Sequence, residues 1–301
     1  MNGMGHPQMK VRFGVGLGAE TTPDELAGVI DHLESSGVDS VWFSELVYTP
    51  AVDPFVGMAY ALARTRRLKV GTSVAILPGR HPVLVAKQLA SLAALAPKRV
   101  LPAFGLHSAL PPERDIFVVP DGRRAAVFDE SLDLLRAALR GGDVSFEGEY
   151  FTVRSAQVQP VPATPIDIWL GGSAPAALTR IGKFGDGWLG SFLTPDEAAA
   201  ARRRIEAEAV AAGRTIEPDH FGISLAVGDG ALPADLLAAV RRRRPDVDPE
   251  DLIAADWPDL HRQLDRYQAA GLTKFVIRAA GPADRAAFVD RFTAELLPRQ
   301  N

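Results

Sequence analysis

Short apolar runs rich in Val, Ile and Phe recur along the chain, and each is followed by a segment with the pattern of a helix. Strands that alternate with helices in this way pair in parallel through right-handed crossovers, so this alternation limits the possible folds more than any other feature. The predicted strands are Val11–Leu17, Asp39–Glu45, Leu68–Ile76, Arg99–Gly105, Ile166–Leu170, Gly187–Phe192, His220–Val227 and Thr273–Ala279.

The predicted helices begin at recognisable start signals. In Thr22-Pro23-Asp24-Glu25 and in Thr194-Pro195-Asp196-Glu197, a proline follows a threonine in the first turn. The predicted helices start at Thr22, Asp53, Ser173 and Thr194, or span Pro82–Ala96, Arg123–Arg140, Trp257–Ala270 and Pro282–Leu297. About eight strand–helix units in 301 residues fit an α/β fold, a (β/α)₈ TIM barrel with insertions. An open doubly wound sheet is the alternative, because strand counts from one sequence err by one or two.

Two segments interrupt the alternation and are predicted as insertions in a single domain spanning 1–301. Residues 144–153 alternate apolar and polar side chains around Glu147-Gly148, which predicts a β-hairpin outside the barrel. Residues 228–256 are polar and predict a helical insertion. The run Arg241–Arg244 within it is interpreted as the solvated face of a helix, with an anion site as the alternative. The fold is expected to begin near Met9.

Composition narrows the chemistry. The chain has no cysteine, which excludes disulfides, thiolate zinc sites, iron–sulfur clusters and cysteine nucleophiles. Its six histidines are scattered, so we predict no metal site. A formal net charge of −4 gives no electrostatic reason to expect nucleic-acid binding. No apolar stretch reaches the ~20 residues of a membrane span, and the polar N-terminus has no signal-peptide core, so we expect a cytoplasmic protein that does not bind membranes.

In a barrel of this type the active site lies at the carboxyl ends of the strands, so residues there are the first candidates. Gly171-Gly172-Ser173 follows the fifth predicted strand and precedes a helix. Free backbone N–H groups at the positive end of a helix can hold a phosphate. A plain tight turn with a serine cap explains the same three residues equally well.

Two titratable side chains also follow strands. Glu45, after the second strand, can orient a cofactor or relay a proton, and a salt-bridged strand end is the alternative. His107, after the fourth strand, can donate a hydrogen bond or shuttle a proton, although a loop histidine without a role fits almost as well. Ser73 has no obvious histidine partner and the G-x-S-x-G motif is absent, so a hydrolase triad is unsupported.

Taken together, these segments resemble the bacterial luciferase-like superfamily, and within it the branch that uses the deazaflavin coenzyme F420. The resemblance covers residues 10–300 and depends on the order and spacing of motifs that are each weak alone. The motifs are Gly37–Glu45, Val70–Val74, Arg80-His81-Pro82, Leu89–Leu92, Lys98-Arg99-Val100, Gly148–Phe151, Gly171-Gly172-Ser173 and Gly185-Asp186-Gly187-Trp188.

The resemblance implies a barrel that is usually a homodimer and that holds a flavin or deazaflavin at its mouth. In the F420 branch a bulge in the third strand contains a non-prolyl cis peptide bond, which would fall at Ser73-Val74 and support the ring. The cofactor phosphate would lie on Gly171-Gly172-Ser173. The ring and side chain would pass Ile76, Leu106 and His107, with Glu45 also beside the cofactor.

The chain also departs from this family pattern. Many members have Asp-His after the second strand, where Glu45-Leu46 stands here, and sugar-phosphate dehydrogenases of the branch have a glutamate at the position of Ser108. The resemblance therefore favours hydride transfer between F420 and a small organic substrate, with Glu45 or His107 relaying a proton. An FMN-dependent monooxygenase that uses O₂ is one alternative. A catalytically idle flavin-binding protein is another, and the absent histidine at Leu46 supports it.

Overall fold

One parallel sheet forms the centre of the molecule. The computed structural model describes residues 10–281 and 283–301, so Met9 and Pro282, which the sequence placed at the start of the fold and of the last helix, lie outside the described residues. The sheet order is β4-β6-β9-β10-β11-β12-β1-β2-β3-β5, with parallel pairing throughout. The strands are β1 (Arg12–Leu17), β2 (Ser40–Phe43), β3 (Lys69–Thr72), β4 (Ala75–Ile76), β5 (Val100–Leu101), β6 (Ala103–Gly105), β9 (Trp169–Gly171), β10 (Gly187–Ser191), β11 (Phe221–Val227) and β12 (Lys274–Ala279).

The sheet closes on itself. β3 and β4 are two parts of one strand interrupted at Ser73-Val74, and β5 and β6 are two parts of the next strand interrupted at Pro102. β3 pairs with β5 and β4 pairs with β6, so the two strands at the ends of the sheet order are neighbours. Eight strand positions therefore surround one axis, which confirms the predicted TIM-barrel fold.

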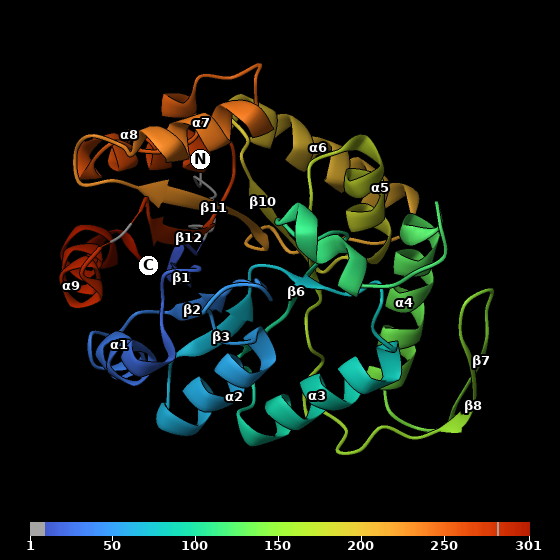
Figure 1. Cartoon of the computed structure of the whole chain (residues 1–301). Coiled ribbons are helices and arrows are strands. Elements are labelled where there is room, and N and C mark those ends of the chain that lie inside the picture. Colours follow the sequence, from blue (N-terminus) through green and yellow to red (C-terminus); the bar gives the residue numbers. More distant parts are fainter. Residues whose placement is uncertain (1–9, 282) are drawn as a thin grey trace, which may run out of the picture.

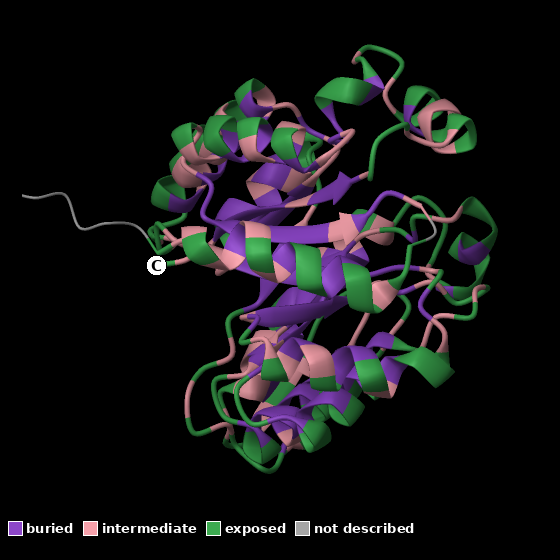
Figure 2. Cartoon of the chain, turned by 90° about the vertical axis from the view of Figure 1, so that its left-hand side faces the viewer, coloured by how far each residue is buried: buried purple, intermediate pink, exposed green. Residues whose placement is uncertain are grey.

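Helices surround the barrel, as Figure 1 shows. They are α1 (Pro23–Ser35), α2 (Pro54–Arg64), α3 (Pro82–Leu95), α4 (Arg124–Leu139), α5 (Pro175–Phe184), α6 (Pro195–Ala211), α7 (Ala234–Arg243), α8 (Trp257–Ala269) and α9 (Arg285–Leu296). The predicted start signals are used: Thr22 with Glu25, and Thr194 with Glu197, form capping boxes at α1 and α6. Figure 2 shows buried strands in the middle and exposed outer faces on the helices.

The barrel interior is filled by large aromatic side chains for which neighbouring strands leave room. Trp42 and Trp169 are buried and meet edge to face, with ring centroids 6.3 Å apart. A Cβ at Gly71 would lie 2.6 Å from the Trp42 ring, and a Cβ at Gly187 would lie 2.5 Å from the Trp169 ring. These two glycines allow the indole rings to pack inside the barrel, where bulky side chains fill the space in this fold.

The amino-terminal end of the barrel is held by an ion network around Asp39, whose side chain is buried just before β2. Asp39 Oδ1 accepts a hydrogen bond of 2.8 Å from Lys69 Nζ, and its Oδ2 accepts one from Lys274 Nζ. The two lysines begin β3 and β12, which are separated in the sheet by β1 and β2. Burial alone would raise the pKa of Asp39, but the charges of Lys274 and Lys69 outweigh it and hold that pKa well below its usual range.

Two elements differ from their predicted bounds. The fifth strand was expected at Ile166–Leu170 but is Trp169–Gly171. Its start is shifted because the Ile168 N–H donates to the Asp186 carboxylate (2.9 Å) and not to a neighbouring strand. The next helix begins at Pro175 with Ala174 as its cap, and not at Ser173.

The two predicted insertions contain structure of their own. β7 (Val144–Glu147) and β8 (Thr152–Ala156) pair antiparallel in a separate two-stranded sheet, seen at the outer edge in Figure 1. Residues 228–256 contain α7 and the short 3₁₀ helix Pro249–Asp251. Within the part of the chain that the structure describes, no helix is both long enough and apolar enough to cross a membrane.

Candidate active site

Val74 stands at the carboxyl-terminal mouth of the barrel, between β3 and β4. The Ser73-Val74 peptide bond is cis, at the position that the family resemblance implied. A Cβ at Gly105 would lie 2.5 Å from Val74 Cγ2, and a Cβ at Gly171 would lie 3.1 Å from Val74 Cγ1. The half-buried Val74 side chain therefore packs over the bare ends of β6 and β9, and the sequence-predicted residues of three strands meet here.

Glu45 lies beside this segment and is held by an arginine. Its carboxylate is buried (4% exposed) and accepts hydrogen bonds from the Ile76 N–H (2.6 Å) and from Arg80 Nη1 (3.0 Å). Arg80 Nη2 donates to the other carboxylate oxygen, and Nη1 also donates to the Ile76 carbonyl (2.6 Å). These contacts favour the interpretation of Glu45 as a salt-bridged strand end that positions β4, because both of its oxygens are already engaged.

The Gly171-Gly172-Ser173 turn is exposed and presents unused backbone donors. Among the described residues, no acceptor is recorded for the N–H groups of Gly172 and Ser173. Gly172 has φ +118°, and a Cβ there would lie 2.9 Å from the Cβ of Ala177, so only glycine fits the turn without strain. The turn leads into α5, and its donors match an anionic group such as a phosphate.

His107 lies on the loop after β6 with an exposed side chain. Burial of part of the ring, together with the positive charges of Arg124 and Arg114, lowers the pKa of His107. The imidazole is therefore neutral at neutral pH and has one donor and one acceptor nitrogen available. His107 and Leu106 line an open cavity of about 400 Å³ together with residues 119–122, 124 and 125.

Ile76, which the resemblance placed beside the cofactor, has a buried side chain. Its side chain is only 1% exposed and lies behind the wall, with Cδ1 3.7 Å from the position that a Cβ on Gly105 would take. Its backbone, and not its side chain, contributes to the site by holding Glu45 and Arg80. Ser73 donates its N–H to the Phe43 carbonyl (2.8 Å), which fixes it to β2.

Glu113 is a buried carboxylate at the mouth that sequence reasoning missed. It belongs to the 3₁₀ helix η1 (Pro111–Ile116) and is 0% exposed. Its oxygens accept hydrogen bonds from the Tyr48 N–H (2.7 Å) and the Ser108 hydroxyl (2.6 Å). Glu113 therefore joins the loop after β2 to the loop after β6. Glu113 and Tyr48 are 65 residues apart in the sequence, so no local motif pointed to Glu113.

Arg278, near the end of β12, adds positive charge to the mouth. Its Cβ lies 3.6 Å from the position that a Cβ on Gly16 of β1 would take. Burial and the charge of Arg243 lower the pKa of Arg278, and the charge of Glu20 opposes them. Glu20 itself pairs with Arg285 at 2.9 Å, and no ion pair to Arg278 is recorded among the described residues.

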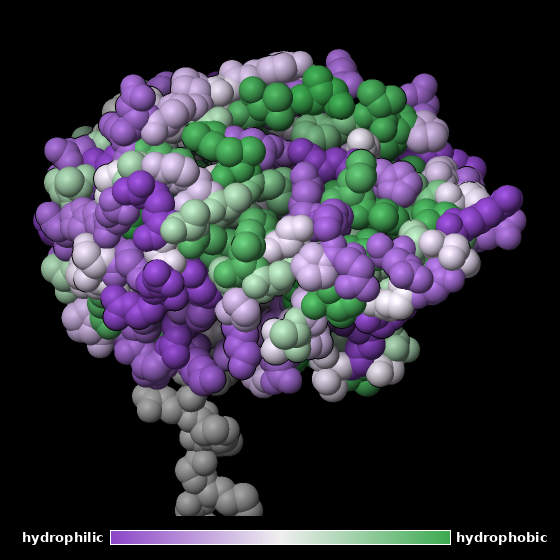
Figure 3. All heavy atoms as spheres, turned by 90° about the horizontal axis from the view of Figure 1, so that it is seen from below, coloured by the Kyte–Doolittle hydropathy of each residue, from purple (hydrophilic) through white to green (hydrophobic). Residues whose placement is uncertain are grey.

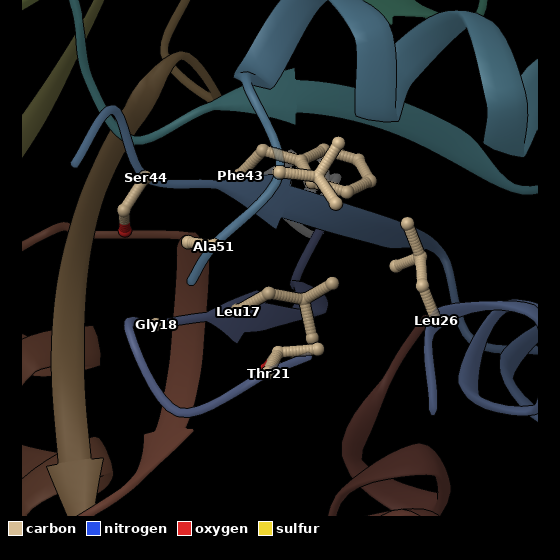
Figure 4. Close-up of a pocket in the computed structure, with 8 residues that line it drawn as sticks. Leu17, Gly18, Thr21, Leu26, Phe43, Ser44 and Ala51 are labelled. Atoms are coloured by element: carbon tan, nitrogen blue, oxygen red, sulfur yellow. The ribbon is translucent and has the colours of Figure 1, made fainter. Parts of the chain in front are cut away.

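A smaller crevice lies between the ends of β1 and β2. Figure 4 shows Leu17 and Phe43 between Ser44 on one side and Leu26 of α1 on the other. The crevice has a volume of about 10 Å³, which is room for one water molecule at most. It is therefore too small for a cofactor or substrate, and the candidate site is the mouth around Val74, His107 and the Gly171-Gly172 turn.

The chain is similar to known proteins over nearly its whole length. The model of a family described as luciferase-like monooxygenase matches residues 9–297. An F420-dependent glucose-6-phosphate dehydrogenase of Beutenbergia cavernae is 30% identical over 96% of this chain and 97% of the relative.

Two solved structures share the fold. An F420-dependent secondary alcohol dehydrogenase, solved with an F420–acetone adduct, has a TM-score of 0.83 at 19% identity, covering 97% of this chain and 100% of that chain. The oxygenating constituent of 3,6-diketocamphane monooxygenase from Pseudomonas putida, in complex with FMN, has a TM-score of 0.76 at 16% identity, covering 97% and 99%.

Proposed function

The chain belongs to the luciferase-like monooxygenase family, and from this premise we propose that it is a coenzyme F420-dependent oxidoreductase. It transfers a hydride between F420 and a small organic substrate. The observation that carries the proposal is the 30% identity, over nearly the whole of both chains, to a relative named as an F420-dependent dehydrogenase.

The residues at the mouth fit the cofactor. The free N–H groups of Gly172 and Ser173 would hold its phosphate, and Val74 with Leu106 would form the wall against its ring. When bound, F420 supplies the hydride chemistry. The Glu45–Arg80 pair holds β4 in place through Ile76, so its contribution is to position the segment that carries Val74.

His107 is the side chain best suited to hold or move a proton. Its lowered pKa leaves the imidazole neutral at neutral pH, so it can accept a proton at its free ring nitrogen. Glu45 is bound to Arg80, and the Ser108 hydroxyl is bound to Glu113. Leu46 and Ser108 stand where the family pattern has a histidine and a glutamate, so oxidation of a sugar phosphate by such a pair is disfavoured.

An FMN-dependent monooxygenase is the second candidate, since a protein of this fold has been solved with FMN. Rapid mixing of F420-loaded protein with a panel of alcohols and aldehydes separates the two. Among these alcohols and aldehydes, those that also carry an acidic group are tested first, because Arg278 adds positive charge to the mouth. We expect the deazaflavin absorbance to change without O₂ consumption. O₂ consumption with reduced FMN, and no change with F420, would refute the proposal, and no turnover with either would support the idle protein.

We also propose that the protein is a homodimer that associates through α2 and α3. Figure 3 shows hydrophobic side chains across the face on which these helices lie. The exposed apolar residues there are Val56 and Tyr60 of α2 and Leu84 and Leu95 of α3. Light scattering should give a dimer for wild type and a monomer for Leu84→Asp, whereas Val210→Asp, on the equally exposed α6, should stay dimeric. If the wild-type protein is monomeric, the homodimer proposal is wrong.

A further inference from the structure

Glu113 is a buried carboxylate to which the proposed reaction gives no task. Its side chain is 0% exposed, and among the described residues it has no recorded ion pair. Its recorded hydrogen-bond donors are both neutral, the Tyr48 N–H (2.7 Å) and the Ser108 hydroxyl (2.6 Å). Burying a carboxylate costs free energy that an apolar side chain would not cost, so a role for Glu113 has to come from what these two bonds hold in place.

On one side, Glu113 closes the short turn that begins at His107. Ser108 Oγ accepts a hydrogen bond from the Leu110 N–H (3.1 Å) while its hydroxyl donates to Glu113 Oε2. The Glu113 N–H donates in turn to the Leu110 carbonyl (3.1 Å). The backbone that follows His107 is therefore fixed by hydrogen bonds that all lead to Glu113.

The 3₁₀ helix η1, which contains Glu113, is fixed at its other end as well. Phe117 directly follows η1 and is buried, and a Cβ at Gly79 would lie 2.8 Å from the Phe117 Cα. The Arg80 guanidinium lies over the Phe117 ring, 5.1 Å from its centroid, and Arg124 Nη2 donates to the Phe117 carbonyl (2.8 Å). The segment that follows His107 is thus anchored at both ends of η1, and His107 and Arg124 line the same cavity.

We propose that Glu113 is a positioning residue that acts through Ser108 to hold His107 beside the proposed cofactor site. The proposal depends on the function proposed above, in which His107 holds or moves a proton. No hydrogen bond of the imidazole is recorded among the described residues, so the backbone that carries the ring decides where the ring lies. Proton transfer needs the ring nitrogen within about 2.6–3.2 Å of its partner, and a fixed turn increases the share of molecules with that geometry.

The test is the pKa of His107, measured by NMR titration of protein with labelled histidine and assigned with His107→Gln. The charged residues that line the cavity with His107 are Arg124 and Asp121. In the wild type, partial burial and the charges of Arg124 and Arg114 lower the pKa of His107. Glu113→Ala should free the turn and let the ring move into water, so the pKa of His107 should rise toward its ordinary value of about 6.5.

Two further variants make the test specific. Ser108→Ala breaks the link between Glu113 and the turn but leaves the hydrogen bond from Tyr48, so the pKa of His107 should rise here too. Asp115→Ala is the matched control, because it removes an exposed carboxylate from the same 3₁₀ helix with no recorded hydrogen bond among the described residues. It should leave the pKa of His107 unchanged.

His261 provides an internal control in every spectrum. It lies on α8 with its Nε2 2.9 Å from Glu295, and its titration should be the same in all variants, which shows that the fold is intact. If Glu113→Ala alters His261 as well, the result with Ser108→Ala decides. An unchanged pKa of His107 in Ser108→Ala, or an equal rise in Asp115→Ala, overturns the proposal.

Addition of F420 separates this proposal from the proposed function. In the wild type, the His107 signal should shift when F420 binds. Binding of F420 without a shift of that signal overturns the placement of His107 beside the cofactor. If F420 does not bind, the proposed function is overturned, whereas a rise in the pKa of His107 in Glu113→Ala and Ser108→Ala still shows that Glu113 positions the ring.

Discussion

Two buried carboxylates flank the same strand, Asp39 before β2 and Glu45 after it, and they are held in different ways. Asp39 takes its cations from the first residues of β3 and β12, so it joins three strands of the barrel. Glu45 takes its cation from Arg80, on the loop that leads to α3. The first pair stabilises the sheet itself, and the second positions a segment at the mouth. The residue before β2 therefore contributes to stability, and the residue after β2 contributes to the candidate site.

The largest expected effect is that of Asp39→Ala. It leaves Lys274, whose side chain is 8% exposed, without its counter-ion. Removing one partner of a buried ion pair typically costs about 3–5 kcal/mol, and denaturant-induced unfolding should show a loss of that size. Asp31→Ala, which removes the half-exposed partner of Arg64, should change the free energy of unfolding little. An equal loss of unfolding free energy in both variants would show that the Asp39 network stabilises the fold no more than an exposed ion pair does.

Acid should remove part of the same contribution. The pKa of Asp39 is held low in the folded protein by Lys274 and Lys69, against burial. Such a carboxyl group stabilises the fold above its unfolded-state pKa of about 3.9, and this stabilisation is lost as the pH falls through the folded-state pKa. The free energy of unfolding should therefore fall below about pH 4, and less steeply in Asp39→Asn. Parallel pH profiles for the two proteins would contradict this.

Glu45→Gln should have a smaller and more local effect. The amide keeps the shape but loses the charge that faces Arg80, so we expect about 1–3 kcal/mol in unfolding. Hydrogen exchange should increase in residues 73–80, and F420 should bind about tenfold more weakly through the loosened wall. The amide exchange of β3 and β12 at the opposite end should not change. A loss of stability as large as that of Asp39→Ala would remove the contrast between the two ends.

The barrel could be predicted because its signals are local. Alternating apolar runs and helix starts that contain a proline, such as Thr22-Pro23, are visible within a few residues. The helix starts that they predict are present at α1 and α6. The shift of the fifth strand could not be predicted, since it depends on the Asp186 side chain, which lies on another strand–helix unit. The same reason explains Glu113, whose partners Tyr48 and Ser108 come from separate loops.

For the candidate site, the sequence was informative where the backbone conformation requires a particular residue. Gly172 points to a turn because its positive φ and its close approach to Ala177 require glycine, and the structure places that turn at the mouth. The side chain of Ile76, which the resemblance placed beside the cofactor, is buried, as are those of Ala75 and Leu77 on either side of it. The partner of Glu45 could not be predicted, because Arg80 reaches it from 35 residues away.

The central claim is that the mouth of this barrel is built for F420. The measurement that tests it most directly is a pair of titrations of the purified wild-type protein, one with oxidised F420 and one with FMN, under the same ionic conditions. The account predicts that F420 binds at least about tenfold more tightly than FMN, a difference of about 1.4 kcal/mol. Tighter binding of FMN, or no binding of F420, would contradict it.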